Sequence, residues 1–135
     1  MKKFNNFIAG AWVEPDSGEY FENRNPADRN DLIGMFPLSR SSDVQRAVES
    51  AKRGFSQWKR TPAPARGDVL RVVGDLLSKR KEEIADIMTR EMGKPLTETR
   101  GDVQEGIDTA YYAASEGRRL FAHRVLRRER RPPSL

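Results

Sequence analysis

The sequence predicts an α/β fold in which short strands come first and about four helices follow. Turn-forming residues interrupt the first forty positions at short intervals, a pattern typical of brief strands. From Ser41 onward the apolar residues recur at helical spacing, which places the change of structure near that residue. With 135 residues, 36% of them apolar and 33% charged, the chain has room for one thin core.

Strands are expected wherever an apolar stretch lies between two turn signals in this first part. Gly10 lies in the middle of the first stretch and indicates a turn, and the Pro-Asp-Ser-Gly run at 15–18 indicates another. A proline, Pro37, ends the last stretch. The predicted strands are two pieces within 7–13, a returning partner strand at 20–24 and a further strand at 32–36.

The first helix is predicted to begin at Ser41 or Ser42, either of which can cap it, with Asp43 in the favourable first turn. Gly54 is expected to end or loosen this helix. One helical face would be formed by Val44, Ala47, Val48, Ala51, Phe55 and Trp58. We expect Trp12 and Trp58 to be core residues rather than platforms for a ligand.

Two further helices are separated from the first by a Thr-Pro-Ala-Pro break at 61–64, where Pro64 suits an opening helical turn. The second helix would present Val69, Leu70, Val73, Leu76 and Leu77 on one side. The third would present Ile84, Ile87, Met88 and Met92. Gly93 is expected to cap the third helix in a left-handed conformation, and Pro95 prevents its continuation.

The fourth helix, over about 97–121, differs because small residues recur on its inner face. That face would consist of Val103, Gly106, Ile107, Ala110, Ala114, Gly117 and Phe121. A glycine inside a helix costs roughly 1 kcal/mol relative to alanine. Its presence therefore predicts that another backbone packs closely here, although no partner for this face is evident within the chain.

The net charge of +5 would be compatible with nucleic-acid binding, but the distribution of that charge along the chain argues against it. The last dozen residues carry +4, so the rest of the chain is nearly neutral. We therefore expect no nucleic-acid partner, and a basic, disordered tail at 122–135. No membrane span or secretory signal is evident, so a cytoplasmic location is the default expectation. Cysteine is absent, which excludes disulfides and a thiol nucleophile from this sequence.

A search for chemistry predicts no catalytic, cofactor-binding or metal-binding residue. His123 is the single histidine and lies beside the basic tail, so we expect it to be solvated and without function. Neither Gly-rich phosphate motif occurs. Gly93-Lys94-Pro95 follows a helix rather than opening one, so it lacks the geometry of a phosphate cradle.

The remaining polar and aromatic candidates have structural explanations. Arg66 opens a helix where the macrodipole disfavours a cation, so a specific structural contact is expected. Tyr111 and Tyr112 are adjacent and point in different directions, which favours core or interface over a base-stacking site. Acidic residues at helical spacings beside Lys or Arg, such as Glu83 with Lys79, predict a charge-laced solvated surface. These acids are Glu82, Glu83, Asp86, Glu91, Asp102, Glu105 and Asp108.

Taken in order, several short motifs resemble the amino-terminal segment of the NAD(P)-dependent aldehyde dehydrogenase superfamily over about 4–121. The motifs lie at 7–13, 25–27, 42–48 with Ala51, Phe55 and Trp58, Arg66 with Leu70, 89–95, 101–103 and 111–113. The 89–95 block and the Asn-Pro-Ala-Asp run look similar to bacterial semialdehyde-oxidising members, such as 2-oxoglutarate semialdehyde dehydrogenase.

The resemblance implies a three-part enzyme with a Rossmann-type cofactor domain, a catalytic domain and an oligomerisation flap. In that family a cysteine thiolate attacks the aldehyde, a hydride passes to NAD or NADP, and a glutamate-activated water hydrolyses the thioester. None of these catalytic residues can be assigned to this sequence, which has no cysteine. Residues 1–121 are thus expected to be an incomplete, amino-terminal part of a cofactor-binding domain.

The resemblance also implies that the chain departs from the family after Phe121, for which a shifted reading frame is one explanation. The chain would then be a truncated, inactive dehydrogenase-like protein that binds no cofactor. The full-length family forms homo-oligomers, so this fragment is expected to need its missing remainder or to self-associate. The alternative is a non-enzymatic helical interaction module that uses its basic tail.

Overall fold

The computed structural model describes residues 2–128, with side chains placed through Arg119. Four short strands are followed by four helices, as the sequence predicts. The chain forms two compact units. The strand unit contains the first sixty residues together with Ala85–Thr99, and the helical unit contains Thr61–Ile84 together with the residues from Arg100 onward.

The first hairpin joins β1 (Asn6–Ile8) to β2 (Ala11–Val13) in antiparallel register. Ala9 and Gly10 connect them with φ angles of 56° and 81°. Two successive positive φ angles are characteristic of the tight two-residue turns that match the twist of paired strands. The predicted turn within 7–13 is therefore confirmed, with its centre at both residues.

The second hairpin joins β3 (Tyr20–Arg24) to β4 (Leu32–Pro37). The prediction that 20–24 returns to pair with the preceding strand was wrong, because β3 pairs with the strand that follows it. The N-terminal residues reach β4 instead, where the Phe4 N–H donates to the carbonyl oxygen of Met35 over 2.9 Å. Phe4 stacks on Phe36 with ring centroids 4.6 Å apart, which fixes this approach.

Helix α1 (Ser41–Trp58) begins one residue after its cap, Arg40, so neither serine is the capping residue. The Asp43 side chain instead accepts a hydrogen bond from the Arg40 N–H, and Gly54 does not end the helix. Its apolar face is exposed at Val44, Val48, Phe55 and Trp58, and Trp12 is 69% exposed. The prediction that Trp12 and Trp58 are core residues was wrong for this chain, in which Trp58 is 44% exposed.

The other helices are α2 (Ala63–Lys79), α3 (Lys81–Met92) and α4 (Leu96–Arg128). Pro64 lies in the first turn of α2, and Gly93 follows α3 with a φ of 70°, both as predicted. Helix α4 continues past the expected end at Phe121, so part of the predicted tail is helical, and 129–135 lie outside the described residues. Within the described residues, no helix combines the length and apolar character needed to span a membrane.

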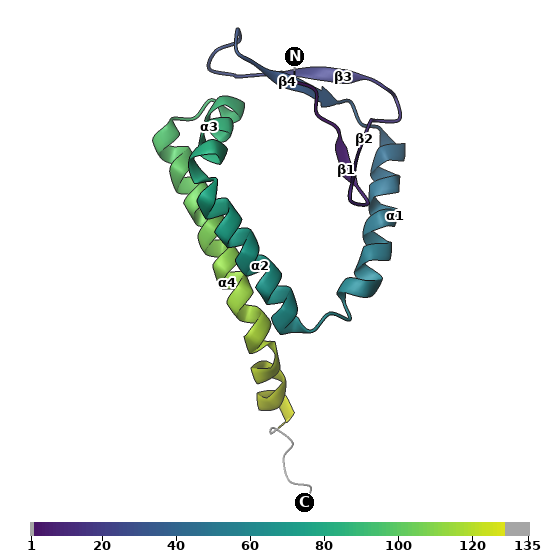
Figure 1. Ribbon diagram of the computed structural model, residues 1–135, viewed down its shortest axis with the longest axis vertical. Helices are drawn as coiled ribbons and strands as arrows, with labels where there is room; N and C mark the ends of the chain where they lie inside the picture. Colours follow the sequence, from purple (N-terminus) through teal and green to yellow (C-terminus); the bar gives the residue numbers. More distant parts are fainter. Residues whose placement is uncertain (1, 129–135) are drawn as a thin grey trace, which may run out of the picture. The chain divides into compact units, whose positions relative to one another are not determined.

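Helices α2 and α4 run side by side in the helical unit (Figure 1), and they meet through small residues. A methyl group on Gly67 would lie 2.5 Å from the carbonyl oxygen of Ala114, and one on Gly117 would lie 2.6 Å from that of Ala63. We call this contact the glycine seam. It supplies the close backbone partner that the fourth helix was predicted to need and that the sequence did not reveal.

The glycine seam shows that the packed faces of α4 and α2 differ in part from the predicted ones. On α4 the predicted inner residues Val103, Ile107 and Ala110 are buried, but Gly106 faces open space. On α2 the buried residues are Ala63, Gly67 and Gly74, whereas most of the predicted apolar face is exposed. Small residues occupy the contact between α2 and α4 because only they allow the two backbones to approach so closely.

Candidate functional site

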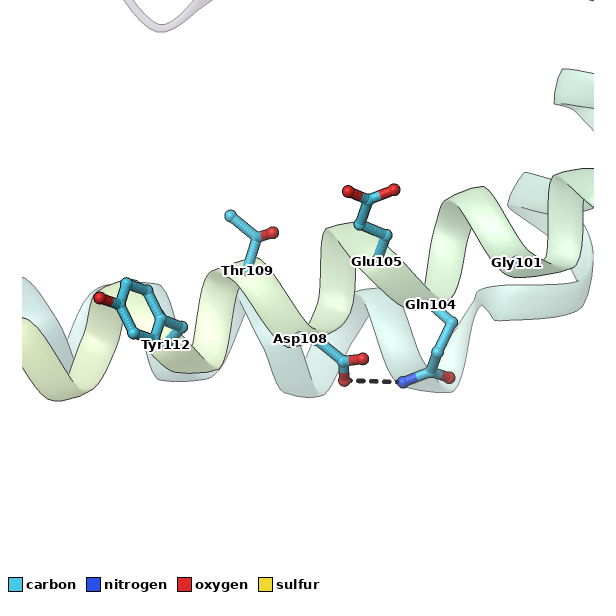
Figure 2. Close-up of a pocket in the computed structure, with 6 residues that line it drawn as sticks. All are labelled: Gly101, Gln104, Glu105, Asp108, Thr109 and Tyr112. Atoms are coloured by element: carbon cyan, nitrogen blue, oxygen red, sulfur yellow. Dashed lines mark hydrogen bonds between the residues drawn. The ribbon is translucent and has the colours of Figure 1, made fainter.

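The largest hollow among those described lies along α4 and has a volume of about 500 Å³. All of its lining residues come from this one helix: Gly101, Gln104, Glu105, Asp108, Thr109 and Tyr112. Figure 2 shows Glu105 and Thr109 projecting to one side of the helix while Gln104 and Asp108 project to the other. The Gln104 amide donates to the Asp108 carboxylate over 2.9 Å. The hollow is thus an acidic groove open to solvent.

This groove does not fit a dinucleotide cofactor. Glu105 and Asp108 line it and no cation does, so the negative charge of a pyrophosphate would be repelled. The amino terminus of α1 is also unsuitable for a phosphate, because the carboxylate of Asp43 already occupies it. Prolines at positions 62 and 64 remove N–H donors from the start of α2.

Among the described residues, Asp43 carries the most deeply buried carboxylate. It is 2% exposed and accepts hydrogen bonds from the backbone N–H groups of Arg40 and Asp16, at 2.9 and 3.0 Å. The Arg46 guanidinium adds a third bond at 3.1 Å. The Arg40 N–H, with further help from Asp16 and Arg46, lowers the pKa of Asp43. Every donor is part of the chain's own backbone or helix, so the role of Asp43 is to fix the start of α1.

Asp31 and Arg90 form a second structural pair in the strand unit. The Arg90 Nε donates to Asp31 over 2.8 Å, and a second guanidinium nitrogen binds the other carboxylate oxygen. The hydrogen bond from Arg90, supported by Asn25, lowers the pKa of Asp31 to about 2. No sequence pattern paired these two residues, because they lie 59 positions apart and belong to different motifs.

The acidic residues that the sequence assigns to a solvated surface form exposed ion pairs where the structure shows their partners. Glu82 binds Arg100 at 2.7 Å, which lowers the pKa of Glu82, and Glu83 binds Arg80 at 2.7 Å. The Glu83–Arg80 pair has the helical spacing that was predicted, although its partner is Arg80 and not Lys79. Glu82 instead pairs across helices with a residue 18 positions away, which the helical spacing did not predict. Of the residues in the described part of the chain, no three His, Cys, Asp or Glu side chains are grouped to hold a metal ion.

The two tyrosines diverge as predicted. The Tyr111 hydroxyl donates to Asp75 over 2.8 Å, which raises the pKa of Tyr111, and its ring covers Gly74. Tyr112 is 66% exposed in the acidic groove. The position of Tyr111 is therefore explained by its contact with α2, whereas Tyr112 is exposed to solvent and is not a core residue.

Three further residues singled out in the sequence are Arg66, Lys94 and His123, and the structure does not show them forming a common site. Arg66 has a buried Nε–H with no acceptor among the residues that the structure describes, so its expected structural contact is not found there. Lys94 pairs with Glu98 at 3.8 Å, consistent with a helix-end contact rather than a phosphate cradle. The side chain of His123 lies outside the described residues.

Comparison with known proteins gives this partial site its context. A model of the aldehyde dehydrogenase family matches residues 12–132, so the match begins and ends later than the 4–121 expected from the motifs. The chain is 42% identical over 114 residues to the alpha-ketoglutaric semialdehyde dehydrogenase of Bacillus subtilis, covering 84% of this chain and 23% of that protein. It is 41% identical over 114 residues to malonate-semialdehyde dehydrogenase 1 of Shouchella clausii, with the same coverage.

A solved structure agrees with these sequence relatives. The NAD-dependent aldehyde dehydrogenase from Sinorhizobium meliloti superposes with a TM-score of 0.81 at 29% identity, over 85% of this chain and 23% of that one. The chain thus spans about a quarter of the length of the relatives it matches, and its strands and helices form a partial α/β domain that resembles part of that enzyme. This chain belongs to the aldehyde dehydrogenase family.

Proposed function

We propose that this chain is the amino-terminal part of an NAD(P)-dependent dehydrogenase that oxidises aldehydes to carboxylic acids, and that it has no such activity alone. The observation that carries the proposal is the combination of a family match over 12–132 with only 23% coverage of the relatives. A segment of this size contributes structure to an active site whose reacting groups lie elsewhere.

The absence of cysteine supports inactivity of the isolated chain. The chemistry implied by the family begins with a thiolate that attacks the aldehyde carbon, and this sequence contains no thiol. A serine or threonine hydroxyl would need an adjacent base, and the one histidine of the sequence is His123, beside the basic tail. The nucleophile must therefore come from the rest of the enzyme.

The cofactor contacts are also assigned to the rest of the enzyme. NAD or NADP carries a pyrophosphate, whereas the acidic groove is lined by Glu105 and Asp108. Bringing the cofactor's phosphates to this groove would place like charges together. Helix α4 instead provides a rigid support, because its opposite side packs on α2 through the glycine seam.

A short semialdehyde that carries a carboxylate is the proposed substrate class. The two relatives above are named for alpha-ketoglutaric semialdehyde and malonate semialdehyde, and both compounds have an aldehyde at one end and a carboxylate at the other. The identity to each relative is nearly equal, so this segment supports the class and not one member of it.

Two proteins test the proposal. The first is the purified chain, assayed with both semialdehydes and both nucleotides, for which we expect no aldehyde-dependent NADH or NADPH formation. The second is a chimaera in which residues 1–119 replace the matching amino-terminal segment of the Bacillus subtilis enzyme, for which we expect turnover of a semialdehyde. Turnover by the isolated chain, or a folded chimaera without activity, would contradict the proposal.

A further inference from the structure

Helix α2 is apolar on two opposite sides, and only one of them is packed in this chain. Ala63, Gly67 and Gly74 form the side that is buried against α4. The other side, which we call the outer face, follows a regular helical spacing of three and four residues. It consists of Val69, Val72, Val73 and Leu76.

The two sides point away from each other. Val69 follows Gly67 by two positions and Leu76 follows Gly74 by two, and a two-residue step turns about 200° around a helix axis. Their exposed fractions agree with this geometry, at 50% for Val69 and 54% for Leu76. A helix that is apolar on opposite sides is typical of an interior element with a neighbour on each.

We propose that the outer face of α2 is the docking surface for the remaining part of the aldehyde dehydrogenase polypeptide. This inference rests on the proposed function. The length of the relatives identifies the occupant, because 23% of such an enzyme superposes on this chain with a TM-score of 0.81 and the rest has no counterpart here. Large exposed apolar side chains in a row are stabilised when another part of a protein covers them.

Arg66 gives this surface a polar end. It precedes Val69 by three positions and Val73 by seven, so it continues the same stripe toward the start of α2. Its Nε–H is buried and has no acceptor in the part of the chain that the structure describes. A buried donor without an acceptor costs free energy. The occupant is therefore expected to bring a carboxylate or a backbone carbonyl oxygen to this end of the outer face.

Cysteine labelling can test the surface directly, because the natural chain has no thiol. Val69→Cys places one on the outer face, and Arg71→Cys places a control on the charged flank of the same helix, where Arg71 is 59% exposed. Each variant is made in the isolated chain and in the chimaera described above. The rate of maleimide addition at each position is followed by peptide mass spectrometry, and unfolded samples give the reference rate.

In the isolated chain we expect both thiols to react quickly. In the chimaera we expect the rate at position 69 to fall at least about tenfold, while that at position 71 changes much less, because a covered thiol is shielded from reagent. An active chimaera whose position 69 reacts as fast as in the isolated chain overturns the docking surface and leaves the proposed function intact. An inactive chimaera overturns the proposed function itself. Concentration-dependent protection in the isolated chain would show a second copy on the surface and would also overturn this assignment.

Discussion

The interactions that stabilise the strand unit internally differ from those that stabilise the helical unit. In the strand unit, carboxylates connect distant segments: Asp43 joins the start of α1 to the turn at Asp16, and Asp31 reaches Arg90 across 59 residues. In the helical unit, the glycine seam brings the backbones of α2 and α4 together at Gly67 and Gly117, and the ring of Tyr111 covers Gly74 farther along. The long-range contacts that distinguish the first unit are charged hydrogen bonds, and the contact that distinguishes the second is the close approach of two backbones.

This difference predicts different sensitivities. Charged contacts respond to pH and to the loss of one oxygen atom, whereas a close backbone contact responds to added volume. The variants below are ordered from the largest expected effect to the smallest. The first two include a control that changes the same residue type where the decisive contact is absent.

The largest effect is expected from Gly117→Val in the glycine seam. A first methyl group at this position already lies 2.6 Å from the carbonyl oxygen of Ala63, so the helices must separate. We expect a loss of about 2–3 kcal/mol in the free energy of unfolding, as is usual for overpacking. Urea denaturation followed by circular dichroism measures it. The control is Gly106→Val on the same helix, where nothing lies within 4 Å, and equal losses for both variants would refute the seam.

Asp43→Ala is expected to lower the melting temperature of the strand unit. It removes the acceptor of the Arg40 and Asp16 N–H groups, which then lie at a site that is shielded from water. The matched control is Asp68→Ala, which removes an exposed pair with Arg118 and is expected to have little effect. Comparable melting temperatures for both variants would show that the Asp43 contacts contribute no more than a surface ion pair.

The Asp31–Arg90 pair predicts loss of stability in acid. The pKa of Asp31 is lowered from 3.8 to about 2 in the folded state, so its contribution is complete above the unfolded pKa. That contribution is lost as the pH falls from about 4 through about 2. Urea midpoints measured across this window should converge for the natural chain and Asp31→Asn. A difference between the two proteins that stays constant down to the lowest pH would contradict the assignment.

The smallest effect is a gain. Gly101 lies within α4, and nothing would contact a methyl group there. Gly101→Ala is therefore expected to raise the free energy of unfolding by about 0.5–1 kcal/mol, through helix propensity alone. A loss of stability in the same denaturation assay would show that this glycine has a packing role which the structure does not contain.

Local signals predicted the order of strands and helices well. Pro64, Gly93 and the glycine of the first turn each marked a boundary that the structure confirms. The packed faces of the helices were harder to predict, since periodicity shows that α2 has an apolar side but does not show which side packs against a neighbour. Val69 and Leu76 were predicted to share one apolar side of the helix, yet the smaller Gly67 and Gly74 are the residues that meet α4.

Contacts between distant segments could not be predicted from the sequence. Asp31 and Arg90 lie 59 positions apart in two different motifs, and nothing in the sequence pairs them. Asp43 was recognised only as an acid in a first turn, although its carboxylate also binds Asp16. The lack of a thiol nucleophile, which a thiolate mechanism needs, could be read directly from the sequence because it contains no cysteine.

The central claim is that α2 is packed through its glycines and open along its valines. Two variants of the isolated chain test it side by side by urea denaturation. Gly67→Val adds volume where a first methyl group already lies 2.5 Å from Ala114, and Val69→Asp puts a charge on the outer face. We expect the first to lower the unfolding midpoint strongly and the second to leave it nearly unchanged. A larger loss for Val69→Asp would mean that the outer face is buried in this chain and would contradict the account.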